Sequence, residues 1–128
     1  MLKATASGPS VIACNTCRRA GVPGGGERLL AALRRVRETS PDYAGVAVEE
    51  MPCLFACSSG CTVHLRAPGR IGYVLGHFEP DEEAARAILD YALAYARSAE
   101  GQVPYRDWPE GVKGHFLVRI PPEGFVVT

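Results

Sequence analysis

The chain has 128 residues and equal numbers of basic and acidic side chains, 14 of each, which argues against a protein that binds nucleic acid through its phosphates. Its length suits one domain, and its hydrophobic share of 47% excludes extended disorder. Because no apolar run approaches the about 20 residues of a membrane helix and the first residues lack an apolar signal stretch, we expect a cytoplasmic protein without membrane contact.

The first third of the chain predicts a strand, a loop and a helix. A short strand is expected over 10–13, followed by a loop over 18–26, where four glycines and a proline oppose regular structure. From Glu27 the pattern becomes helical, because apolar residues recur three and four positions apart at Leu29, Leu33 and Val36. Pro41 and its neighbours end this helix.

The middle of the chain predicts three strands. Residues 45–50 form the first of them and run directly into a group of cysteines. The other two, over 62–66 and 71–78, are joined by the short turn 67–70. A turn of this length predicts an antiparallel hairpin.

A second helix is expected to open at Pro80 with three acidic residues, which suit the positive end of a helix dipole, and to end near Arg97. Residues 115–120 suggest a final strand or extended arm. Strand–helix–strand followed by strand–strand–helix is an α/β (α+β) arrangement of the thioredoxin-like kind. We therefore expect a single domain, with a core over about 10–97 and a C-terminal extension over about 98–128.

The cysteines are the most informative residues. There are five: Cys14, Cys17, Cys53, Cys57 and Cys61. An odd number without an export signal argues against a disulfide framework and favours metal or redox chemistry. Because both groups follow predicted strand ends, we expect their loops to meet at one edge of the sheet.

Two cysteine pairs offer four thiolates, a set that suits zinc or an iron–sulfur cluster. The Cys14–Cys17 spacing fits a zinc knuckle, whereas the Cys53–Cys57 spacing fits that knuckle less well and does not match the common ferredoxin runs. Cys61 is an alternative ligand to Cys57 or a buried spare thiol. Spacing therefore predicts a four-thiolate centre and leaves its metal open.

A thiol–disulfide oxidoreductase is a further alternative for the Cys14–Cys17 pair. In that chemistry the first cysteine sits at the N-terminus of a helix, which lowers its pKa. The predicted glycine-rich loop after Cys17 places no helix there, which disfavours this alternative.

The segment 11–17 followed by two arginines resembles the first ligand pair of thioredoxin-like 2Fe–2S ferredoxins, and 53–57 followed by the strand from Thr62 resembles the second. The resemblance covers roughly residues 10–97. Nearly the whole chain is also similar to a family of bacterial predicted metal-binding proteins of unknown function, whose members accompany cobalamin-biosynthesis genes.

These resemblances imply a 2Fe–2S electron carrier rather than an enzyme. Cys14 and Cys17 would ligate one iron, and Cys53 and Cys57 the other. The resemblance further implies a homodimer, a redox partner protein and a link to cobalamin biosynthesis.

Other residues give weaker signals. His64 and His77, on adjacent predicted strands, are either ordinary strand histidines or hydrogen-bond donors near the cluster. Four arginines are candidates for a basic rim that attracts an acidic partner: Arg18, Arg19, Arg66 and Arg70. Four aromatic residues are expected to act as packing anchors: Tyr91, Tyr95, Tyr105 and Trp108.

Overall fold

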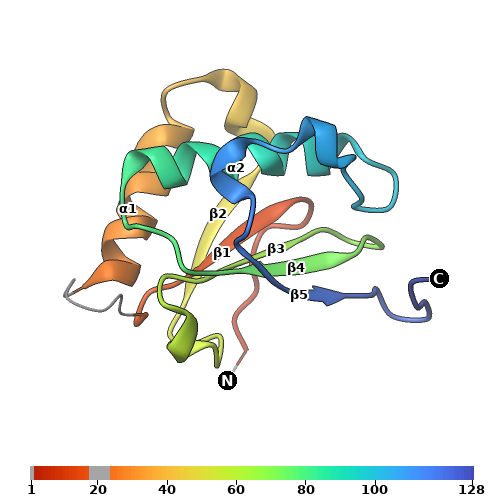
Figure 1. Cartoon of the computed structure of the whole chain (residues 1–128), viewed down its shortest axis with the longest axis horizontal. Coiled ribbons are helices and arrows are strands. Elements are labelled where there is room, and N and C mark those ends of the chain that lie inside the picture. The colour runs from red at the N-terminus through yellow and green to blue at the C-terminus, as the bar shows by residue number, and fades with distance from the viewer. Residues whose placement is uncertain (1, 18–23) are drawn as a thin grey trace.

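The computed structural model describes residues 2–17 and 24–128, which form a five-stranded mixed sheet with two α-helices. The helices are α1 (Gly25–Arg37) and α2 (Glu82–Arg97). The strands are β1 (Ser10–Cys14), β2 (Ala47–Met51), β3 (Val63–Arg66), β4 (Gly72–Leu75) and β5 (Phe116–Ile120). They lie in the order β2-β1-β3-β4-β5, with β1 and β2 parallel and all other pairs antiparallel (Figure 1). The predicted α+β element order is confirmed.

The first unit, β1–α1–β2, is a crossover, which parallel neighbours require. The apolar stripe of α1 is buried as predicted, at Leu29, Leu33 and Val36. The helix begins at Gly25 rather than Glu27, so the predicted loop is shorter at its C-terminal end. The rest of that loop, 18–23, lies outside the described residues.

The hairpin β3–β4 leads into α2. The Asp81 side chain accepts a hydrogen bond from the N–H of Ala84 at 2.9 Å, which caps the helix at its N-terminus. The predicted strand over 71–78 is too long, because β4 ends at Leu75. His77 has a φ of +62°, a left-handed conformation that turns the chain out of the strand.

The C-terminal extension contains a fifth strand, because β5 pairs antiparallel with β4 along one edge of the sheet. Val118 lies opposite Val74 while Phe116 lies opposite Leu75, so Leu117 is an extra residue, a β-bulge. Side chains alternate between the two faces of a strand, and one extra residue shifts that alternation. The bulge therefore places Phe116 and Arg119 on the same face.

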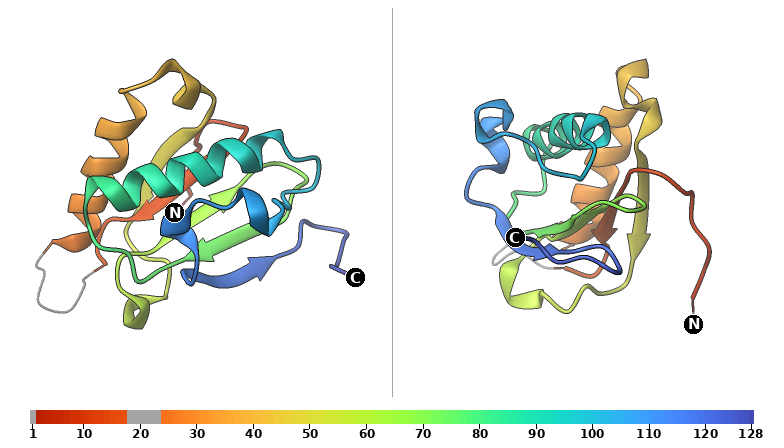
Figure 2. Two further views of the ribbon diagram at one scale, coloured as in Figure 1. Left: turned by 45° about the horizontal axis from the view of Figure 1, so that its top comes forward. Right: turned by 90° about the vertical axis from the view of Figure 1, so that its right-hand side faces the viewer.

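Both helices cover one face of the sheet, and the core lies between them and the strands (Figure 2). Tyr91 and Tyr95 are among the largest fully buried side chains, which confirms them as packing anchors. Within the described part of the chain, the opposite face carries no α-helix (Figure 2). None of the helices described in residues 2–17 and 24–128 is long and apolar enough to cross a membrane.

Candidate metal centre

Cys14 and Cys17 lie together at the C-terminal end of β1. Cys14 is the last residue of that strand, and Cys17 follows a short turn. Their side chains are 1% and 3% exposed, and their thiols are hydrogen-bonded to each other. The structure thus brings the first predicted ligand pair together inside the protein.

Two threonine hydroxyls lie beside these sulfurs. Thr16 Oγ1 is 3.6 Å from Cys14 Sγ, and Thr62 Oγ1 is 3.0 Å from Cys17 Sγ. Thr62 also accepts a hydrogen bond from the N–H of Cys14 through its carbonyl oxygen, at 3.1 Å. Sequence reasoning placed Thr62 in a strand and missed this role, since only the pairing of β1 with β3 brings it to the cysteines.

The two thiols have opposite pKa shifts. Burial raises the pKa of Cys14, but hydrogen bonds from Cys17, Thr16 and the backbone of Leu54 outweigh burial and lower it to about 7. Burial and the hydrogen bond to Cys14 raise the pKa of Cys17 to about 11. A thiolate is therefore available at Cys14 near neutral pH, and the thiolate is the form that binds metals.

The loop after β2, which carries Cys53, lies against Cys14. Cys14 Sγ is 3.9 Å from the carbonyl oxygen of Pro52, and the backbone of Leu54 is hydrogen-bonded to the same sulfur. Within this loop, the N–H of Phe55 donates to Cys53 Sγ at 3.2 Å. The two cysteine-bearing loops therefore meet at one edge of the sheet, as the topology predicts.

The other two cysteines follow this loop. Cys57 opens a short 3-10 helix over Cys57–Ser59, and its side chain lies outside the described residues. Cys61 is 0% exposed and belongs to the hydrophobic core. Among the side chains that the structure describes, no three of His, Cys, Asp or Glu form a group ready to hold a metal. The four-ligand set Cys14, Cys17, Cys53 and Cys57 remains a prediction.

Helix α1 begins directly beside the first pair, where the sequence predicted no helix. The N–H of Gly26 donates to the carbonyl oxygen of Cys17 at 2.8 Å. A Cβ atom at position 26 would lie 2.3 Å from the carbonyl oxygen of Cys14, so only glycine fits there. The expectation that the helix starts far from Cys17 is wrong, because glycine permits a close approach that hydrophobic periodicity does not reveal.

The predicted basic rim does not surround the cysteines. Arg66 pairs with Ser10, at the end of β1 opposite Cys14, and Arg70 donates to the carbonyl oxygen of Ala96 at 2.9 Å. The expectation is therefore wrong for these two arginines, since the antiparallel register carries them away. Arg18 and Arg19 lie outside the described residues.

The two histidines do not lie on adjacent strands. His64 is in β3, opposite Ile12 and Val74. His77 follows β4, and its N–H donates to the carbonyl oxygen of Ser59 at 2.6 Å. The prediction is wrong for His77, because the left-handed turn ends the strand before it.

Comparison with protein families gives a match over residues 11–122 to the model of a protein family of unknown function, DUF1636. The chain belongs to the DUF1636 family. No curated protein matches it. The predicted similarity to an uncharacterised family is thus confirmed, and the membership itself assigns no activity.

Solved structures resemble the fold of this DUF1636 chain. One is a thioredoxin-like [2Fe–2S] ferredoxin from Aquifex aeolicus, with a TM-score of 0.58 and 20% identity over 94% of this chain and 100% of the ferredoxin. The 1.5 Å crystal structure of the wild-type thioredoxin-like [2Fe–2S] ferredoxin from Aquifex aeolicus matches with a TM-score of 0.53 and 24% identity. This match covers 69% of this chain and 87% of the ferredoxin. These matches confirm the thioredoxin-like ferredoxin fold.

Proposed function

We propose that this protein is a one-electron carrier whose 2Fe–2S cluster is held by Cys14 and Cys17 on one loop and by Cys53 and Cys57 on the other. The observation that carries the proposal is the contact between these loops: the backbone of Pro52 and Leu54 lies at the sulfur of Cys14. A fold shared with 2Fe–2S ferredoxins supports it.

The donor set fits an iron–sulfur cluster. Cluster irons take thiolate ligands, and the described sulfurs of Cys14, Cys17 and Cys53 lie on two adjoining loops. When bound, the cluster would supply a redox couple that accepts and returns one electron. The chain would do no bond chemistry itself, so it would act as a carrier rather than an enzyme.

We assign Cys57 rather than Cys61 as the fourth ligand, because 53–57 resembles the second ligand pair of thioredoxin-like 2Fe–2S ferredoxins. Cys61 is 0% exposed and lies in the hydrophobic core, whereas Cys53 is partly exposed on its loop.

The surroundings of the sulfurs would tune the cluster. Thr16, Thr62 and the backbone of Leu54 already make hydrogen bonds to Cys14 and Cys17. Hydrogen bonds to ligating sulfurs and burial from water are two of the ways in which a protein sets a reduction potential.

A redox partner would dock over the Cys53 loop. Phe55, two residues from Cys53, is 98% exposed and is held at a φ of +57°. Exposed aromatic side chains are enriched at protein interfaces, and weak electron-transfer contacts need only a small area. An acidic docking face on the partner stays a prediction from the sequence, because Arg18 and Arg19 lie outside the described residues.

Three further parts of the proposal rest on resemblance or on the sequence. We expect a homodimer, action in the cytoplasm and a link to cobalamin biosynthesis. Light scattering tests the first directly, by comparing the measured mass with the 13.7 kDa of one chain.

The decisive experiment is a visible spectrum of protein purified without air, with iron, sulfide and zinc measured on the same sample. We expect red-brown protein with about two irons and two sulfides per chain, which bleaches on reduction. Colourless protein with one zinc per chain would overturn the proposal in favour of a structural or metal-delivery module.

Cysteine variants test the ligand assignment. Cys53→Ser should lose most of the bound iron, because one thiolate ligand is removed. Cys61→Ala should keep about two irons per chain while unfolding at lower urea, since it removes only a core side chain. Loss of iron in Cys61→Ala and its retention in Cys57→Ser would make Cys61 the ligand.

A thiol–disulfide oxidoreductase is the second candidate, and one observation favours it. The two thiols of a Cys-x2-Cys pair are hydrogen-bonded to each other, and α1 begins beside them. Metal-free protein that reduces a disulfide substrate, and loses this activity in Cys14→Ser, would establish this function instead.

A further inference from the structure

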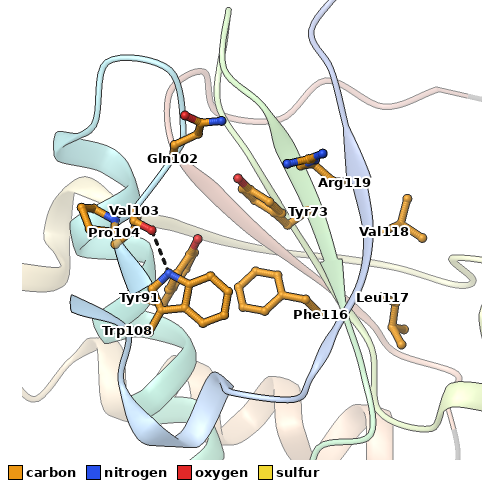
Figure 3. Close-up of a pocket in the computed structure, with 10 residues that line it drawn as sticks. All are labelled: Tyr73, Tyr91, Gln102, Val103, Pro104, Trp108, Phe116, Leu117, Val118 and Arg119. Carbon is orange, nitrogen blue, oxygen red and sulfur yellow. Dashed lines mark hydrogen bonds between the residues drawn. The ribbon is translucent and has the colours of Figure 1, made fainter. Parts of the chain in front are cut away.

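A cavity lies between α2, β4, β5 and the segment 102–108, and it shares no residue with the cysteine loops (Figure 3). Its volume of about 640 Å³ lies within the roughly 300–1,000 Å³ typical of ligand sites. Aromatic and apolar side chains form most of its wall: Tyr73, Tyr91, Val103, Pro104, Trp108 and Phe116. Leu117 and Val118 also line it, although their side chains point away from it (Figure 3). Gln102 and Arg119 add polar groups.

The aromatic wall is fixed in place. The ring centroids of Trp108 and Phe116 are 4.6 Å apart, and the ring of Tyr91 meets that of Trp108 edge-on at 5.9 Å. The indole N–H of Trp108 donates to the carbonyl oxygen of Val103 at 2.9 Å, which locks the orientation of that ring (Figure 3). A planar ligand would therefore meet a surface that needs little ordering on binding.

The hydroxyl of Tyr91 points into this cavity from a buried ring (Figure 3). The Tyr91 side chain is 1% exposed, and Tyr91 is one of the residues that line the cavity. Burial raises the pKa of Tyr91 well above its usual value, so the hydroxyl stays protonated and can donate. An oxygen of a bound molecule could accept a hydrogen bond from this hydroxyl.

Arg119 supplies a positive charge at the same cavity. The β-bulge at Leu117 turns Arg119 to the face that also carries Phe116, and Arg119 lies opposite Tyr73 across the strands (Figure 3). Arg119 makes no ion pair within residues 2–17 and 24–128, and no acidic side chain of these residues lines the cavity. The charge of Arg119 is therefore available to pair with one negative charge of a ligand.

We propose that this cavity binds a small planar aromatic carboxylate. The ring of the ligand lies against Trp108 and Phe116, the guanidinium of Arg119 donates to the carboxylate, and the hydroxyl of Tyr91 donates to a ligand oxygen. A single guanidinium suits a carboxylate, because its paired N–H groups match the two oxygens and its charge matches one negative charge. A doubly charged phosphate would leave one negative charge without a partner.

Calorimetric titration of the full chain with 2-naphthoate tests the proposal. We expect saturable binding of one ligand per chain, accompanied by a change in the fluorescence of Trp108, the only tryptophan in the sequence. Arg119→Met should weaken binding about tenfold, and Tyr91→Phe several-fold, as expected for a charged and a neutral hydrogen bond. Arg66→Met, which removes the same charge outside the cavity, should leave the affinity unchanged.

Two further probes separate charge from shape. The uncharged 2-naphthamide should bind about tenfold more weakly and should not respond to Arg119→Met. Cyclohexanecarboxylate, which keeps the charge without an aromatic face, should also bind more weakly. Absence of saturable 2-naphthoate binding would overturn the proposal. Equal effects of Arg119→Met and Arg66→Met would overturn it as well, because binding would then follow net charge alone.

Discussion

Gly26 sets how closely α1 approaches the first cysteine pair. A Cβ atom there would lie 2.3 Å from the carbonyl oxygen of Cys14 and 2.9 Å from the amide nitrogen of Cys17. We expect Gly26→Ala to lower the free energy of unfolding by about 2 kcal/mol, because the overlap outweighs the better helix propensity of alanine. Urea denaturation measures this loss, and iron per chain should fall with it.

Gly45→Ala is the matched control. A Cβ atom at Gly45 meets nothing within 4 Å, so the same substitution should change stability by less than about 0.5 kcal/mol and leave the iron content intact. Equal destabilisation by the two variants would show that the contact at Gly26 is not the cause.

The candidate cysteines could be predicted from the sequence, but the residues that contact them could not. Residue type and spacing were enough to single out Cys14, Cys17, Cys53 and Cys57 as candidates. The close approach of Gly26 and the hydroxyl contact of Thr62 depend on which backbones lie next to each other, and no local sequence pattern carries that information.

At the scale of an element, β3 carries a histidine that resists protonation. His64 lies on the sheet face without a helix, between Ile12 and Val74. Burial and then the nearby charge of Arg66 lower its pKa below the usual value of about 6.5. Because the unfolded chain binds this proton more readily, His64 should reduce stability progressively as pH falls below about 6.5.

NMR titration of the His64 ring should show the low pKa, and Arg66→Met should raise it. Arg28→Met removes a charge from the exposed side of α1 and should leave it unchanged. In His64→Gln, the decrease in urea stability between pH 7 and pH 5 should be smaller than in the wild type. A His64 pKa above 6.5 would contradict the argument.

Element type followed well from periodicity, whereas element length did not. The apolar stripe of the first helix and the hairpin are as predicted. The strand expected to reach Phe78 ends at Leu75, because His77, at a φ of +62°, turns the chain out of the strand and its N–H bonds to the carbonyl oxygen of Ser59. Such a contact exists only in the folded chain, so no local sequence pattern predicts it.

For the whole molecule, β5 joins the C-terminal extension to the core. Phe116 contacts the rings of Tyr73, Tyr91 and Trp108 at 5.3, 5.2 and 4.6 Å. We therefore predict one cooperative unfolding transition, in which Trp108 fluorescence and far-UV circular dichroism give the same urea midpoint.

Phe116→Ala should lower both urea midpoints together, because a half-buried ring is lost. The free energy of unfolding should fall by about 2 kcal/mol. Leu117→Ala, at the bulge, should cost less than about 1 kcal/mol, since that side chain is 37% exposed. A fluorescence transition that precedes the circular dichroism transition would make the extension a separate unit.

Phe55 is not the residue that would give the highest stability at its position. A left-handed conformation costs a residue with a side chain about 1 kcal/mol relative to glycine, and a ring in water recovers none of that cost by burial. A chain selected for stability alone would carry glycine at this position. Engineering for thermostability would therefore remove this phenylalanine first, and with it the aromatic group that marks the surface beside Cys53.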